Sequence, residues 1–101
     1  MILAIDFDRV IHDVEHPAPG RKMGPPIEGA AEGVWALIND GHTVVVHTLR
    51  GDKPQHVVDW LAYFGFPPGL EVTNIKPDAD WFVDDRALRF TGWEQTLQEL
   101  A

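Results

Sequence analysis

The sequence predicts one α/β domain built on a mostly parallel sheet. Three short apolar runs, Ile2–Ile5, Thr43–His47 and Trp81–Val83, lack the in-out alternation of a half-exposed strand. Such runs are typical of central strands in a sheet covered on both faces. Helical patterns lie between them, and strands that alternate with helices indicate βαβ units. With 101 residues, 45% of them apolar, the chain is long enough for one such domain over residues 1–101 and too short for two.

Three helices are expected from their start and stop signals. The first begins at Ala31 and stops before Gly41, and the second begins at Pro54 and stops before Gly65. Both repeat apolar residues at the spacing of one helix face. The third begins at Thr91, where Thr-Gly-Trp-Glu has the form of a capping box and an apolar face follows.

Weaker patterns complete the predicted domain. Leu70–Thr73 and Ala87–Phe90 are expected to be edge strands, which makes a sheet of five. Asn74–Asp80 is too short for a helical crossover between parallel strands, so we expect a loop with at most one turn. His12–Pro26 has no periodicity and should form a long loop or small hairpin that projects from the end of the first strand. Long ordered loops in compact domains are usually functional or mobile.

Composition excludes several kinds of chemistry and partner. The chain has no cysteine, so it has neither a thiolate metal site nor a cysteine nucleophile. Its formal net charge of −8 repels polyanions, which argues against general nucleic-acid binding. No apolar run reaches membrane-spanning length and no basic leader follows Met1, so we expect a cytoplasmic protein that binds no membrane.

Polar side chains follow the predicted strands, at the edge where open parallel sheets bind ligands. These residues are Asp6, Asp8, Thr48, Arg50, Lys76, Asp84 and Asp85. Four carboxylates at one place would repel one another, and a divalent cation would remove the conflict. Oxygen ligands without histidine or cysteine favour Mg²⁺ over zinc, and Mg²⁺ typically brings a phosphate with it.

The same residues carry the chemistry of phosphate transfer. The Thr48 hydroxyl can donate a hydrogen bond to a phosphoryl oxygen, and Lys76 can neutralise it as a compact cation. One carboxylate can attack the phosphorus to form an aspartyl-phosphate, and a second can pass a proton to the leaving oxygen.

Four motifs of this chain resemble, in order, those of the haloacid dehalogenase superfamily. They are Asp6-Phe-Asp8-Arg-Val10, Thr48 at the end of Val-Val-Val-His-Thr, Lys76-Pro77, and Val83-Asp84-Asp85. The resemblance covers essentially the whole chain. It implies a Rossmann-like three-layer sandwich, a flap at about residues 12–26, and no cap domain, because no insertion is long enough to form one.

The resemblance also implies roles for the site residues. Asp6 would be the nucleophile and Asp8 the general acid and then base. Thr48 and Lys76 would bind the phosphoryl group. The Mg²⁺ ligands would be Asp6, Asp8 through its backbone carbonyl, Asp84 and Asp85.

Position 9 departs from the family, since many relatives have glycine or another small residue where this chain has Arg9. The arginine could bind substrate, clash with it, or point outward and pair with a flap acid such as Asp13 or Glu15. Arg50 is a second candidate substrate contact, with a surface role as the alternative. His12 and His16 lie on the flap and could reach the site, but we expect both to be surface residues.

These observations predict a Mg²⁺-dependent phosphomonoesterase that acts through an aspartyl-phosphate. A phosphorylated small molecule is the expected substrate, although an uncapped site also admits a large one. Two alternatives remain, a non-catalytic phosphate- or partner-binding module and a nucleic-acid end phosphatase with a basic track. The sequence does not determine the physiological substrate or the oligomeric state.

Overall fold

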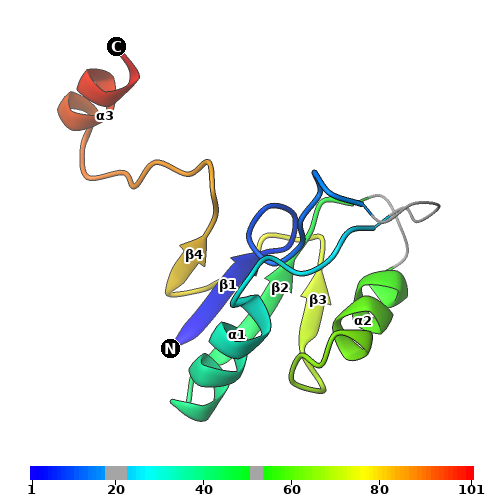
Figure 1. Cartoon of the computed structure of the whole chain (residues 1–101). Coiled ribbons are helices and arrows are strands. Elements are labelled where there is room, and N and C mark those ends of the chain that lie inside the picture. The colour runs from blue at the N-terminus through cyan, green and yellow to red at the C-terminus, as the bar shows by residue number, and fades with distance from the viewer. Residues whose placement is uncertain (18–22, 51–53) are drawn as a thin grey trace.

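A computed structural model describes residues 1–17, 23–50 and 54–101 and shows an α/β fold (Figure 1). Within these residues four parallel strands form one sheet in the order β3-β2-β1-β4, accompanied by three helices. The elements are β1 (Ile2–Asp6), α1 (Ala30–Asn39), β2 (Thr43–His47), α2 (Pro54–Tyr63), β3 (Glu71–Thr73), β4 (Trp81–Val83) and α3 (Trp93–Leu100). The strands predicted at the three apolar runs and the first two helices are therefore confirmed, but β4 is not the central strand that the sequence predicted. It lies at the edge of the sheet and all three of its residues are exposed, because no described helix covers it. None of the described helices has the length and apolar character of a membrane span.

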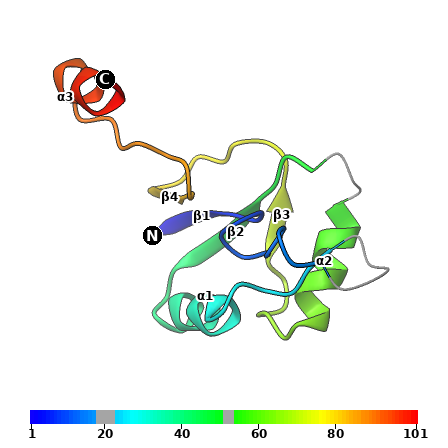
Figure 2. The same cartoon turned by 45° about the horizontal axis from the view of Figure 1, so that its top comes forward.

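The hydrophobic core lies on one face of this sheet. Ile5 stands between Val46 of β2 and Val83 of β4 in the strand register, and Val46 is fully buried. Val34 of α1 and Trp60 of α2 pack into the same cluster of buried side chains. Figure 2 shows both helices on this side of the sheet. The right-handed βαβ connections of parallel strands account for the shared face.

The connection from β3 to β4 crosses the opposite face. Residues 74–80 contain no helix, as the sequence predicted, and run from the carboxyl end of β3 over the sheet to the amino end of β4 (Figure 2). At the start of β4 the Asp80 N–H donates to the Ile2 carbonyl at 2.8 Å, and the Ile2 N–H donates to Asp80 Oδ2 at 2.7 Å. These two bonds fix β4 beside β1.

The prediction of a five-stranded sheet is wrong, because Ala87–Phe90 forms no strand. After β4 the Arg86 N–H donates to Asp84 Oδ1 at 2.9 Å, which turns the chain away from the sheet edge. The Arg89 guanidinium then stacks over the Trp81 ring, 4.4 Å from its centre. These side-chain interactions take the place of a strand ladder.

The predicted three-layer sandwich is not formed either. α3 projects from the body of the molecule and packs against no other helix or strand of the described residues (Figure 1). Its predicted capping box is also wrong, since the helix begins at Trp93 with Gly92 as the N-cap and no side-chain cap. Gly92 has φ 141° and ψ 157°, a conformation essentially restricted to glycine, and it sets the direction in which α3 leaves.

A tight loop follows β1 and begins the flap. The Phe7 carbonyl accepts from the N–H groups of Ile11 at 2.9 Å and His12 at 2.8 Å, and the Arg9 N–H donates to the His12 carbonyl at 2.9 Å. Arg9 has φ 71°, in the left-handed region. Glycine adopts this conformation without the steric cost of a Cβ, so the backbone at position 9 favours glycine. Residues 18–22 of the predicted flap lie outside the described residues.

The backbone of Arg9 predicts a measurable strain. We expect Arg9→Gly to be about 1 kcal/mol more stable to unfolding than Arg9→Ala, because a left-handed residue with a Cβ costs roughly 1–2 kcal/mol and the greater freedom of glycine in the unfolded chain offsets part of it. Both variants remove the same ion pair, so chemical denaturation of the pair isolates the backbone contribution. Equal stability of the two variants would show that the loop carries no strain at this position.

Candidate functional site

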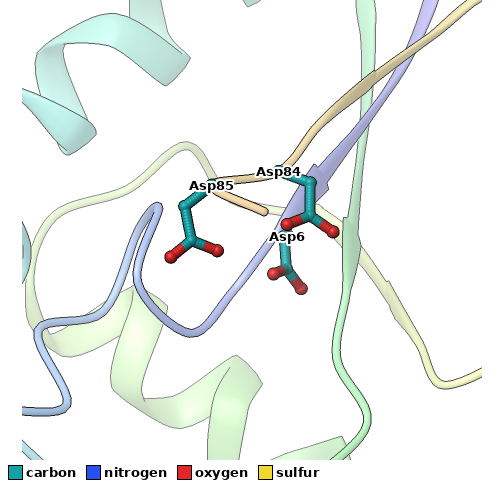
Figure 3. A group of neighbouring side chains, drawn as sticks. All are labelled: Asp6, Asp84 and Asp85. Carbon is teal, nitrogen blue, oxygen red and sulfur yellow. The ribbon is translucent and has the colours of Figure 1, made fainter. Parts of the chain in front are cut away.

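Three carboxylates meet at the carboxyl ends of β1 and β4. Ile5 pairs with Val83, so Asp6 and Asp84 are the next residues of neighbouring parallel strands. One oxygen from each of Asp6, Asp84 and Asp85 lies within 4.8 Å of the others. Figure 3 shows the Asp6 and Asp84 carboxylates close together, with Asp85 beside them. The predicted convergence of polar residues at the strand ends is therefore confirmed for these three.

Charge at this cluster is unfavourable without a counterion. Burial raises the pKa of Asp6 above its ordinary value of 3.8, and the negative charge of Asp84 raises it further. Asp84 and Asp85 are exposed, so a cation could reach the cluster from solvent. Carboxylate oxygens are the ligands that hard divalent cations prefer. The three residues present can therefore hold a metal ion.

The Asp8 side chain belongs to a different group of contacts. Its Oδ1 accepts from His12 Nδ1 at 2.8 Å and from Arg50 Nη1 at 3.0 Å. The Asp8 carboxylate is therefore held by two N–H donors and lies outside the three-carboxylate cluster. Any role of Asp8 at a metal rests on its backbone carbonyl, as the sequence resemblance implied.

His12 is buried, and the prediction that it is a surface residue is wrong. It is 1% exposed, and its ring stacks on Phe7 with the ring centres 5.0 Å apart. The Gly24 N–H donates to His12 Nε2 at 2.8 Å, so Nε2 carries no proton and Nδ1 is the nitrogen that donates to Asp8. Spacing alone could not reveal this contact, because it depends on the tight turn at Phe7–His12.

Gly24 ties the far side of the flap to the same network. Its carbonyl accepts from Trp60 Nε1 at 3.0 Å, so it is joined both to the flap histidine and to the core helix α2. A Cβ at this position would collide with the Asp13 carbonyl oxygen, which leaves room only for glycine. The chain Asp8–His12–Gly24–Trp60 therefore connects the site to the hydrophobic core.

The predicted phosphate-binding residues follow β2 and β3. Thr48 comes directly after β2, and Lys76 lies in the connection that follows β3. Thr48 is 5% exposed, donates its N–H to the Thr73 carbonyl at 3.0 Å, and accepts the Arg50 N–H at its hydroxyl oxygen at 3.1 Å. The Lys76 ammonium lies 4.8 Å from the centre of the Phe82 ring. Lys76 lines a hollow together with Asp84, which is one of the three clustered carboxylates.

The candidate substrate contact Arg9 is engaged with the flap. Its Nη1 lies 3.0 Å from Glu15 Oε1, and both side chains are exposed. Arg9, Glu15 and Asp85 line one shallow hollow. This is the pairing with a flap acid that the sequence left open, and the hollow that Arg9 lines extends to Asp85 of the carboxylate cluster.

Comparisons with known proteins add information on the fold alone. The chain matches no known family model, and no curated protein matches its sequence. It is similar to the structure of a conserved protein from Bacteroides thetaiotaomicron, with a TM-score of 0.68 and 22% identity over 99% of this chain and 88% of that one. The similarity supports the arrangement of strands described above.

Proposed function

We propose that this protein is a Mg²⁺-dependent phosphomonoesterase that forms an aspartyl-phosphate on Asp6. The observation that carries the proposal is the cluster of Asp6, Asp84 and Asp85 at the ends of two neighbouring strands. Asp8, two residues from Asp6, is held separately by N–H donors. This chemistry needs two carboxyl groups, a nucleophile at the cation site and an acid-base group outside it. Asp6 and Asp8 have these two positions.

The residues have the following roles in the proposal. Asp6 attacks the phosphorus, and Asp8 gives a proton to the leaving oxygen and later takes one from the hydrolytic water. Because Oδ1 of Asp8 already accepts two hydrogen bonds, Oδ2 carries the transferred proton. The Thr48 hydroxyl donates to a phosphoryl oxygen.

Lys76 needs a side-chain movement in this proposal. Its ammonium rests over Phe82 and has to leave that ring to neutralise the phosphoryl group. Lysine has a flexible stem, so this movement requires no change of the backbone.

The metal site in the proposal consists of Asp6, Asp84 and Asp85, with the Asp8 carbonyl as a further ligand. A bound Mg²⁺ supplies positive charge that offsets carboxylate repulsion and withdraws electrons from the phosphoryl oxygens. All three side chains are oxygen donors, which fits Mg²⁺ better than zinc.

The alternative of a nucleic-acid end phosphatase has less support from the described residues. Its basic track would use Arg9, Arg50, Arg86 and Arg89. Arg9 pairs with Glu15, Arg50 pairs with Asp8 and Arg89 stacks on Trp81, whereas Arg86 Nε lies 3.9 Å from Asp85 Oδ1 and the Arg86 side chain stays mostly exposed. A small phosphorylated substrate fits this charge distribution better, because the surface is acidic overall.

The proposal is tested by assaying a panel of phosphomonoesters and end-phosphorylated oligonucleotides with and without Mg²⁺. We expect turnover that requires Mg²⁺ and is lost in Asp6→Asn, because the amide cannot attack phosphorus. Asp59→Asn, on the exposed surface of α2, is the matched control and should retain wild-type activity. Equal turnover by Asp6→Asn and wild type would remove Asp6 as the nucleophile, and no turnover of any phosphomonoester would favour the binding module.

The contact between His12 and Asp8 predicts different effects of two conservative variants. His12→Asn places an amide N–H near the Nδ1 position and keeps the donor to Asp8, whereas His12→Gln places its amide near Nε2 and keeps only the contact with Gly24. Both lose the stacking on Phe7 equally. We expect kcat on alkyl phosphates to be about tenfold lower in His12→Gln than in His12→Asn, since a hydrogen bond of about 1–1.5 kcal/mol is lost.

The leaving group provides the control for this comparison. Aryl phosphates need little protonation on departure, so the two variants should differ little on them. If kcat falls equally in the two variants on both alkyl and aryl phosphates, His12 contributes to packing and does not position Asp8.

A further inference from the structure

α3 carries an apolar stripe that the rest of its own domain leaves open. Trp93, Leu97 and Leu100 recur at the spacing of one helix face and are 69%, 64% and 71% exposed. A helix of eight residues is too short to be stable in water without packing partners. The stripe therefore needs a surface to cover it.

A matching surface lies on and after β4. Trp81, Phe82 and Leu88 are 45%, 42% and 42% exposed and line one hollow at the uncovered edge of the sheet. We call these three residues the β4 surface. Exposed apolar groups gathered in this way are typical of interaction surfaces.

Charge around the two surfaces is complementary. Lys76 and Arg89 stand over the Phe82 and Trp81 rings of the β4 surface, whereas α3 carries no basic residue. Of its two acids, Glu94 follows Trp93 of the stripe, and Glu99 accepts from Gln95 Nε2 at 2.7 Å. The hollow is also lined by His47 and two acids. Of these acids, Asp80 accepts the Ile2 N–H and Asp84 accepts the Arg86 N–H. The acidic helix would therefore meet the two cations at the aromatic part of the hollow.

The arm between β4 and α3 directs the helix away from its own sheet. Within the arm, which comprises residues 84–92, Arg89 stacks on Trp81 of β4, and Phe90 packs edge-to-face on Trp93 of α3 with ring centres 5.6 Å apart. Gly92 between them has its glycine-only conformation. In both Figure 1 and Figure 2 the arm carries α3 outward, away from β4 of the same chain, with which it makes no contact.

We infer that α3 packs on the β4 surface of a second copy of this chain, so that two copies exchange their C-terminal helices. Each copy offers one helix and one acceptor surface, which allows a closed two-fold dimer. The exchange buries the three stripe residues of each α3 and covers the β4 edge of each copy. An uncovered sheet edge can otherwise pair unspecifically with strands of other chains. The inference and its test require no phosphatase activity, although the hollow is lined by two residues of the proposed site, Lys76 and Asp84.

Engineered disulfides test the exchange directly, because the chain has no cysteine of its own. Ala87→Cys places a thiol beside the β4 surface, and Thr96→Cys places one at the margin of the stripe while keeping all three stripe residues. The two full-length single variants are mixed, refolded together and oxidised. We expect a cross-linked species of twice the chain mass that joins position 87 of one copy to position 96 of the other.

Gln95→Cys, on the opposite face of α3, is the matched control and should lose this cross-link when mixed with Ala87→Cys. Light scattering should show a dimer of the wild type that Leu97→Asp converts to a monomer, with circular dichroism to show that the variant is folded. Three results would each overturn the inference. The first is a monomeric wild type, and the second is a dimer without the 87–96 cross-link. The third is a double variant Ala87→Cys/Thr96→Cys that closes its disulfide within one monomeric chain. The last result would show that α3 covers its own sheet.

Discussion

Repulsion between Asp6 and Asp84 is the constraint on which the rest of the site depends. The parallel register of β1 and β4 places these carboxylates on adjacent strand ends, and burial of Asp6 strengthens their effect on each other. The strand ladder, in which Ile5 pairs with Val83, and the two hydrogen bonds between Asp80 and Ile2 hold the strands in this register despite the repulsion. A bound cation would relieve this repulsion, so the same carboxylates that destabilise the metal-free site would favour metal binding. The proposed function depends on this property.

The flap contributes the second half of the site by holding Asp8 apart from the cluster. The turn after β1 returns His12 to the Asp8 carboxylate, and Gly24 locks the His12 ring in the tautomer that donates to Asp8. Trp60 then joins Gly24 to the core. A loop that would otherwise move is fastened to the packed helix α2, which keeps the two carboxylates in separate environments.

The sequence predicts the sheet and the carboxylate cluster because both depend on local pattern. Apolar runs identify β1, β2 and β4, and polar residues directly after parallel strands must share one edge. The burial of His12 could not be predicted, since it arises from a turn that brings polar groups together. The apolar stripe of α3 predicted a packed helix, but α3 contacts no other helix or strand of the described residues. An amphipathic pattern does not specify which surface covers it, and the three-layer prediction failed for that reason.

The unfolding free energy of the metal-free protein across pH tests the account most directly, with wild type compared to Asp6→Asn. The pKa of Asp6 is raised in the folded state, so the wild type should lose stability relative to the variant as pH rises from about 4. At neutral pH the metal-free Asp6→Asn should be the more stable protein, and Mg²⁺ should stabilise the wild type more than the variant. A variant that is no more stable than the wild type at neutral pH, together with no stabilisation by Mg²⁺, would contradict a cation site at these strand ends.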